Sequence, residues 1–158
     1  MLDGRQERTD QPCGDGLQIL QACPDILDPS ATILGGEQEK WLFRSLTNSR
    51  AIWNVLAQQV MMMRWDLGAI LGSNPPLNLF NVDAWDGYQV ARNRLLAFLA
   101  QNQINNAVVL TGDIHSSWAA DLKADFDSPT SPVVAAEFVC SGITSAFWGA
   151  ADPLVRAT

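Results

Sequence analysis

The sequence predicts an α/β protein, more exactly an α+β arrangement in which helices pack on a mixed β-sheet. Two segments carry apolar residues at helical spacing, and four short apolar runs are typical of strands. Along the chain these segments follow the order helix, strand, helix, strand, strand, strand. Helices packed on a mixed sheet fit that order best.

The first 30 residues are expected to be mostly loop, because they are rich in Asp, Gly, Pro and Gln and show no regular period. Cys13 and Cys23 flank a short loop in this region. They could form a disulfide in an oxidising compartment, or they could remain two free thiols. The third cysteine, Cys140, ends an apolar run and is expected to be buried.

The first helix is expected at residues 37–46, where acidic side chains suit the first turn. Its apolar side is formed by Trp41, Leu42 and Leu46. A buried strand is expected at residues 51–57. Three consecutive methionines at 61–63 are expected in the core, although they could also line a pocket.

The second helix is the clearest predicted element and spans roughly residues 87–102. One side of it carries Tyr88, Ala91, Leu95, Phe98 and Leu99. The apolar run at 107–110 follows at once and predicts a fully buried strand. Two further strands are expected at 118–122 and 133–139, with a turn at 125–129.

The composition limits the classes of function. A length of 158 residues predicts one domain, 1–158, with room for a core. A net charge of -7 argues against a nucleic-acid polymer as partner. It leaves a phosphorylated substrate open, because bound cations can reverse the sign of the charge locally. The sequence contains no run of about 18 apolar residues, so it predicts no membrane span.

The segment that follows the 107–110 strand carries the candidate chemistry. Asp113 and His115 stand two residues apart, just past the expected carboxyl end of that strand, where open α/β sheets place ligands. In an extended segment the two side chains would point the same way and could converge on one metal. A carboxylate with an imidazole suits iron, zinc or manganese, and a carboxylate alone would also suit calcium.

Other interpretations of these residues remain open. His115 is the single histidine and could be structural. It could also activate Ser116 or Ser117 as a nucleophile, although no G-x-S-x-G elbow is present. Asp86 is expected to cap the second helix, in preference to a binding role shared with Asp83.

Several segments resemble, in order, those of the PhoD-type alkaline phosphatase family of metallophosphatases. They are LDGRQ at 2–6, ILGGEQEKWL at 33–42, NVLAQQV at 54–60, DAWDGY at 83–88 and TGDIHS at 111–116, followed by EFV at 137–139 and GITS at 142–145. The resemblance covers most of the chain.

The resemblance implies a β-sandwich flanked by helices, so that this chain would be part of a four-layer α-β-β-α sandwich. It implies hydrolysis of phosphodiesters and phosphomonoesters at a cluster of iron and calcium, which would orient a bound hydroxide and neutralise charge on the phosphoryl oxygens. Asp113 and His115 match the metal-ligand positions that come later in the family's sequence. Family members are commonly exported to the periplasm or beyond. The polar amino terminus, in contrast, predicts a cytoplasmic protein if the chain is complete as written.

The chain also departs from the family, because the blocks that carry the early metal ligands lie upstream of the segment at 2–6 and are absent here. We therefore expect an incomplete metal site and a sheet with exposed apolar surface and open edges. Such a chain would associate with itself or with a complementing amino-terminal half, and alone it would be inactive or weak. The alternative is an inactive remnant or an assembly module.

Overall fold

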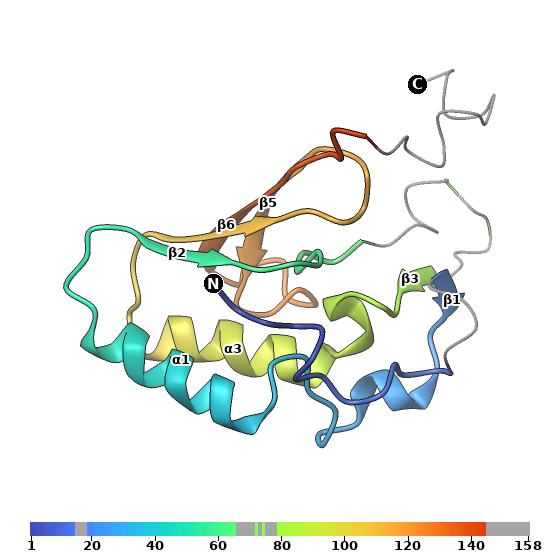
Figure 1. Ribbon diagram of the computed structural model, residues 1–158, viewed down its shortest axis with the longest axis horizontal. Helices are drawn as coiled ribbons and strands as arrows, with labels where there is room; N and C mark the ends of the chain where they lie inside the picture. The colour runs from blue at the N-terminus through green and yellow to red at the C-terminus, as the bar shows by residue number, and fades with distance from the viewer. Residues whose placement is uncertain (15–18, 66–71, 73, 75–78, 145–158) are drawn as a thin grey trace.

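The structure is a computed structural model that describes residues 1–14, 19–65, 72, 74 and 79–144. Figure 1 shows the arrangement of its helices and strands. In chain order the elements are β1 (Ile19–Gln21), the 3-10 helix η1 (Pro24–Leu27), α1 (Gly36–Asn48), β2 (Asn54–Ala57), β3 (Leu79–Asn81), the 3-10 helix η2 (Trp85–Gly87), α3 (Gln89–Gln101), β4 (Ala107–Thr111), β5 (Trp118–Lys123) and β6 (Val133–Val139).

The main sheet is mixed, as predicted, with the strand order β2-β4-β6-β5. Strands β2, β4 and β6 run parallel, whereas β5 pairs antiparallel with β6. The carboxyl ends of the three parallel strands therefore meet at one edge of the sheet. The residues that follow those ends build the candidate site described below.

Both long helices lie on the same face of this sheet (Figure 1). They contact each other through Phe43 and Phe98, whose rings stack with centroids 4.0 Å apart. The core between helices and sheet is aliphatic and includes Leu42, Leu46, Leu56, Leu95, Leu96, Leu99, Val109 and Leu122. Each such side chain contributes about 1.5–3 kcal/mol when it is fully buried. The three methionines at 61–63 are also buried, which confirms their prediction as core residues.

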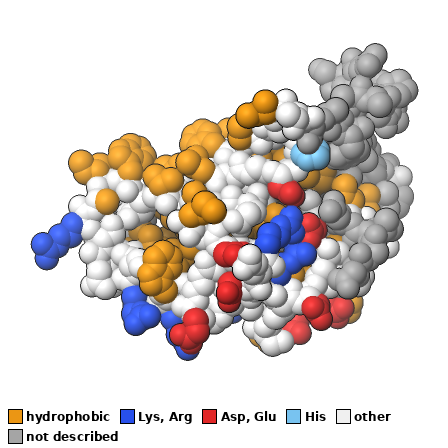
Figure 2. Space-filling view, viewed as in Figure 1, with side chains coloured by type: hydrophobic (Ala, Val, Ile, Leu, Met, Phe, Trp, Pro, Cys, Tyr) orange, Lys and Arg blue, Asp and Glu red, His pale blue; other side chains and the backbone are white. Residues whose placement is uncertain are grey.

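Within the described residues no helix covers the other face of the sheet, and its side chains correct the predictions of a buried strand at 51–57 and a fully buried strand at 107–110. Val55 is 56% exposed, Leu110 is 44% exposed and Phe138 is 51% exposed. Successive side chains on a strand point to opposite faces, so every second residue of these strands faces away from the helices. Figure 2 shows hydrophobic side chains gathered over this part of the molecule.

The amino-terminal region contains more regular structure than the predicted loop at 1–30. Strand β1 pairs antiparallel with β3 in a small second sheet, and η1 follows it. Cys13 and Cys23 form a disulfide with their Cα atoms 5.8 Å apart, which settles the two alternatives left open by the sequence. The segment joins the main sheet where the Leu2 N–H donates to the Ala57 carbonyl at 2.9 Å.

Cys140 is exposed, and the prediction of a buried cysteine is wrong. Val139, the last residue of β6, points into the core, so the next residue along the chain points outward. Among the described helices, none combines the length and the apolar character that a membrane crossing requires.

Candidate functional site

The candidate metal ligands lie in a turn directly after β4. Asp113 and His115 both have positive φ angles, of 72° and 59°, in the left-handed region that few non-glycine residues adopt. The segment is therefore not extended, and the alternation argument that placed both side chains on one side was wrong. Both residues are exposed, and no hydrogen bond or ion pair joins their side chains in the described part of the chain.

The backbone of this turn is fixed by its neighbours on both sides. The Gly112 N–H donates to the Gln59 carbonyl beyond β2 at 3.2 Å, and the Cys140 N–H donates to the Thr111 carbonyl at 2.9 Å. The Ile114 N–H closes a tight turn onto the Gly112 carbonyl at 2.9 Å. The exposed turn is thus attached to the ends of all three parallel strands.

Asp113 contacts an arginine from the amino-terminal segment. The Arg5 Nη2 lies 3.4 Å from Asp113 Oδ2, while the Arg5 Nη1 donates to both carboxylate oxygens of Asp83 at 3.0 and 2.9 Å. Arg8 also donates to Asp83, with its Nη1 at 2.6 Å from Oδ1. Figure 2 shows basic and acidic side chains close together just below the pale blue histidine. Two guanidinium groups therefore share one buried carboxylate, and one of them reaches the candidate ligand.

Local turns place Arg5 and Asp83 for this contact. The Asp3 Oδ1 accepts the N–H groups of Arg5 and Gln6, both at 2.9 Å, and these hydrogen bonds lower the pKa of the Asp3 carboxyl. The Asn81 Oδ1 accepts the Asp83 N–H at 3.1 Å. Short side chains that bond to their own backbone two or three residues on are a common way to fix such turns.

Asp86 is not the cap of the second helix. No side chain caps α3, which begins after Tyr88. The Asp86 carboxylate instead accepts the Trp65 N–H at 2.8 Å and forms a buried ion pair with Arg92. A carboxylate three residues before a helix matches the approximate pattern of a cap, but a buried guanidinium competes more strongly for it.

A buried polar network supports the edge of the sheet beneath the turn. The Thr111 hydroxyl donates to Glu137 Oε1 at 2.6 Å, and the same carboxylate accepts the N–H groups of Met62 at 2.8 Å and Met63 at 2.6 Å. Gln58 donates to the Thr111 hydroxyl at 2.9 Å and accepts the indole N–H of Trp85 at 3.1 Å. The network connects the ends of β2, β4 and β6 to η2.

Burial raises the pKa of the Glu137 carboxyl, and the hydrogen bonds from Thr111 and the two methionine N–H groups oppose that rise. Sequence reasoning missed this residue and the two arginines. The available signals were a single acid inside the apolar run at 133–139 and the segments at 2–6 and 137–139 that resemble the family, which contain Arg5 and Glu137.

The contacts of Ser116 do not support its interpretation as a nucleophile activated by His115. The Ser116 hydroxyl accepts the Trp118 indole N–H at 2.6 Å and lies 3.4 Å from the Ile114 carbonyl. No hydrogen bond links it to His115 among the described residues.

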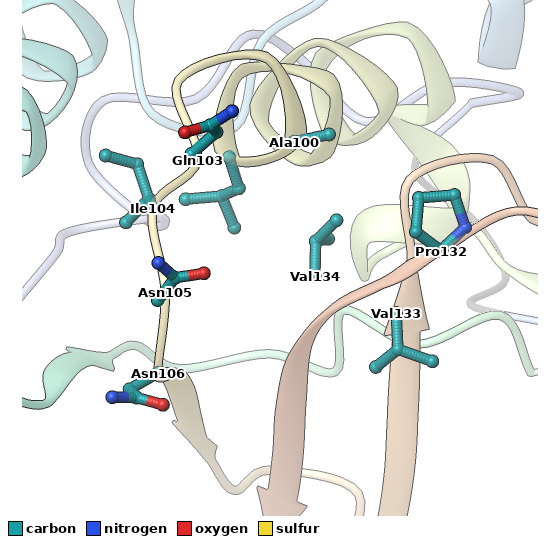
Figure 3. Close-up of a pocket in the computed structure, with 9 residues that line it drawn as sticks. Ala100, Gln103, Ile104, Asn105, Asn106, Pro132, Val133 and Val134 are labelled. Carbon is teal, nitrogen blue, oxygen red and sulfur yellow. The ribbon is translucent and has the colours of Figure 1, made fainter.

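A hollow of about 360 Å³ lies at the opposite end of the sheet (Figure 3). It is lined by residues at the end of α3 and at the beginnings of β4 and β6, including Gln103, Asn106 and Val134. No ionisable side chain lines it, so it offers neither a metal ligand nor an acid or base.

In the described part of the chain, no group of three His, Cys, Asp or Glu side chains could hold a metal ion. The structure thus provides two candidate donors after β4, an arginine pair beside them and a buried network below.

Comparison with known proteins gives a consistent result. A family model described as PhoD-like phosphatase matches residues 1–157. Alkaline phosphatase D of Bacillus subtilis (strain 168) is 43% identical over 150 residues, which are 95% of this chain and 24% of that protein. A solved structure of PhoD superposes with a TM-score of 0.81 at 43% identity and covers 91% of this chain and 26% of its own. The chain thus spans about a quarter of the length of these relatives.

Proposed function

The chain belongs to the PhoD-like phosphatase family, and we propose that it supplies part of the active site of a metal-dependent phosphoester hydrolase. The substrates would be phosphodiesters and phosphomonoesters. The observation that carries the proposal is the match of the family model to residues 1–157, which include Asp113 and His115 in the turn after β4.

The donor set of this turn fits a metal. Asp113 offers a carboxylate and His115 an imidazole, a combination that suits iron, and the carboxylate also suits calcium. Both side chains are exposed and so are accessible to an ion. We propose that these two residues hold iron or calcium, which would neutralise charge on the phosphoryl oxygens of a substrate.

Two donors do not complete a metal site, and we propose that the remaining ligands come from a part of the enzyme that this chain does not contain. The relatives are about four times as long as the matched segment. The exposed side chains of Val55, Leu110 and Phe138 on one face of the sheet support this proposal, because apolar side chains of this size favour contact with another protein surface.

The test is hydrolysis of a phosphodiester by the purified chain with iron and calcium supplied, against the same sample in chelator. A second sample is a chimera in which this chain replaces the matching 150 residues of the Bacillus subtilis relative. We expect chelator-sensitive turnover in the chimera, and weak turnover or none from the chain alone.

The assignment of ligands is tested in the chimera with Asp113→Asn and with Asp121→Asn as matched control, since Asp121 is an exposed aspartate on β5. We expect Asp113→Asn to reduce metal content and activity at least about 10- to 100-fold, whereas the control keeps both. If Asp113→Asn leaves metal content and activity unchanged, the proposed role of Asp113 is wrong.

A further inference from the structure

We infer that Arg5, held in place by Asp83, forms a subsite for a phosphoryl oxygen beside Asp113. The inference rests on the proposed function, because it assigns a substrate-binding residue to the same site. Its basis is the arrangement of two arginines and two aspartates that come from three distant parts of the chain.

The anchor of this subsite is Asp83. Its side chain is only 9% exposed and accepts hydrogen bonds from both Arg5 and Arg8. Such a carboxylate fixes a guanidinium in one orientation and removes much of the entropy that an arginine loses when it binds a ligand. Arg5 therefore does not need Asp113 to stay where it is.

Arg5 uses only one of its two terminal nitrogens to bind Asp83, because Nη1 donates to both carboxylate oxygens. The Nη2 of Arg5 is directed at Asp113. That contact is 3.4 Å long, which is longer than the 2.7–2.9 Å typical of a strong charge-assisted hydrogen bond.

The contact between Arg5 and Asp113 is also open to solvent. The Arg5 side chain is 33% exposed and the Asp113 side chain is 48% exposed. A cation bound by Asp113 would compete with Arg5 for the carboxylate. Arg5 would then keep its bonds to Asp83 and present an Nη2 donor to an anion at the same place, and a phosphoryl oxygen is the anion that guanidinium groups bind well.

The experiment measures binding of inorganic phosphate to the purified, metal-free chain by calorimetry. Asp113→Asn removes the competing carboxylate, so we expect this variant to bind phosphate several-fold more tightly than the unmodified chain. Adding Arg5→Gln to Asp113→Asn should weaken phosphate binding about 10- to 100-fold, the loss expected for one charge-assisted hydrogen bond. Arg50→Gln, which removes an equal charge from an exposed loop, is the matched control and should leave phosphate binding within about twofold.

A second titration separates this inference from the proposed function. Calcium is titrated into the chimera with the Bacillus subtilis relative and into its Arg5→Gln variant, and we expect binding in both, a few-fold tighter in Arg5→Gln because a competing positive charge is gone. Absence of calcium binding from the chimera would count against Asp113 as a ligand, and the phosphate result would still decide the role of Arg5.

The inference is overturned if Asp113→Asn gains no affinity for phosphate, or if Arg5→Gln and Arg50→Gln weaken phosphate binding equally. Circular dichroism of each variant checks that it is folded. If Arg5→Gln does not fold, Arg5→Lys replaces it, and phosphate binding by Asp113→Asn/Arg5→Lys equal to that of Asp113→Asn would likewise overturn the inference.

Discussion

Gly87 lies where the chain turns from η2 into α3, and replacing it by alanine should destabilise the fold strongly. A Cβ atom at this position would lie 2.0 Å from the Val82 carbonyl oxygen and 2.7 Å from the Val82 carbonyl carbon. The first distance is well over 1 Å short of the 3.4 Å at which ordinary van der Waals contact begins. Both neighbours are backbone atoms of a fully buried residue, so no side chain can rotate away to make room.

The expected cost follows from that overlap. Overpacking by one methyl group usually costs about 1–3 kcal/mol, and a clash with backbone belongs at or above the upper end, so we expect at least about 3 kcal/mol. For a chain of this size the midpoint of thermal unfolding should fall by about 6–12 °C. Urea unfolding followed by tryptophan fluorescence and by circular dichroism measures the change in the free energy of unfolding.

Gly36→Ala is the matched control for this experiment. Gly36 is the first residue of α1, is exposed, and its added Cβ would meet no atom within 4 Å. Alanine there should stabilise the chain slightly, by about 0.5–1 kcal/mol, because glycine loses more conformational freedom on folding. If the free energy of unfolding of Gly87→Ala lies within about 0.5 kcal/mol of that of the unmodified chain, the close approach of Gly87 to Val82 is refuted.

Three further predictions concern buried or crosslinked groups. Asp86→Asn should lower the free energy of unfolding by about 3–5 kcal/mol, because it leaves the buried Arg92 without its charged partner; urea unfolding checks this, and a loss below about 1 kcal/mol would contradict it. Reduction of the Cys13–Cys23 disulfide, which spans a sequence separation of 10, should cost about 2–3 kcal/mol; a Cys13→Ser/Cys23→Ser variant should not respond to reductant, and an equal response in both proteins would contradict the prediction. Glu137 has a pKa raised by burial above its ordinary value of 4.5, so the native state holds a proton that the unfolded state releases. Its contribution to stability is therefore fully present below about pH 4.5 and is lost as the pH rises through the folded pKa. The free energy of unfolding, measured across this pH window, should fall in the unmodified chain and fall less in Glu137→Gln. An equal fall in both proteins would show that Glu137 does not titrate there.

The helices and the main sheet could be predicted because their signals are local. The helix expected at 37–46 is α1, the helix expected at 87–102 is α3, and the strands expected at 107–110, 118–122 and 133–139 are β4, β5 and β6. Apolar spacing within a dozen residues is enough to identify such elements. What this spacing does not reveal is whether one face or two faces of a strand are covered, since an apolar run has the same appearance in both cases. The exposure of Leu110 is the consequence.

The small second sheet could not be predicted for a different physical reason. Strands β1 and β3 are each three residues long, and their partners are about 60 positions apart in the sequence. Neither segment has a period long enough to indicate a strand by itself, and each becomes one only through its pairing. The same holds for Asp86, whose role depends on the Arg92 side chain and the Trp65 N–H and not on capping the helix that begins three residues later.

The candidate site separates into a part that the sequence reveals and a part that it hides. Asp113 and His115 stand together in one short motif, so their residue types and spacing are by themselves enough to suggest metal binding. Arg5 lies 78 positions from Asp83 and 108 positions from Asp113, and no local pattern connects them. The fold brings them together because the amino-terminal segment runs from its contact with β2 to the turn after β4.

The two parts of the site also differ in how firmly they are held. Thr111 and Glu137 are buried in a network that joins the ends of three strands, whereas Asp113 and His115 are exposed in a turn with two left-handed residues directly above it. A rigid support below an open turn fixes the backbone of the candidate ligands and leaves their side chains free to accept a metal and further ligands. The network and the backbone hydrogen bonds of Thr111 and Gly112 fix the turn at the end of β4, so weakening the network should shift the turn and move both donors together.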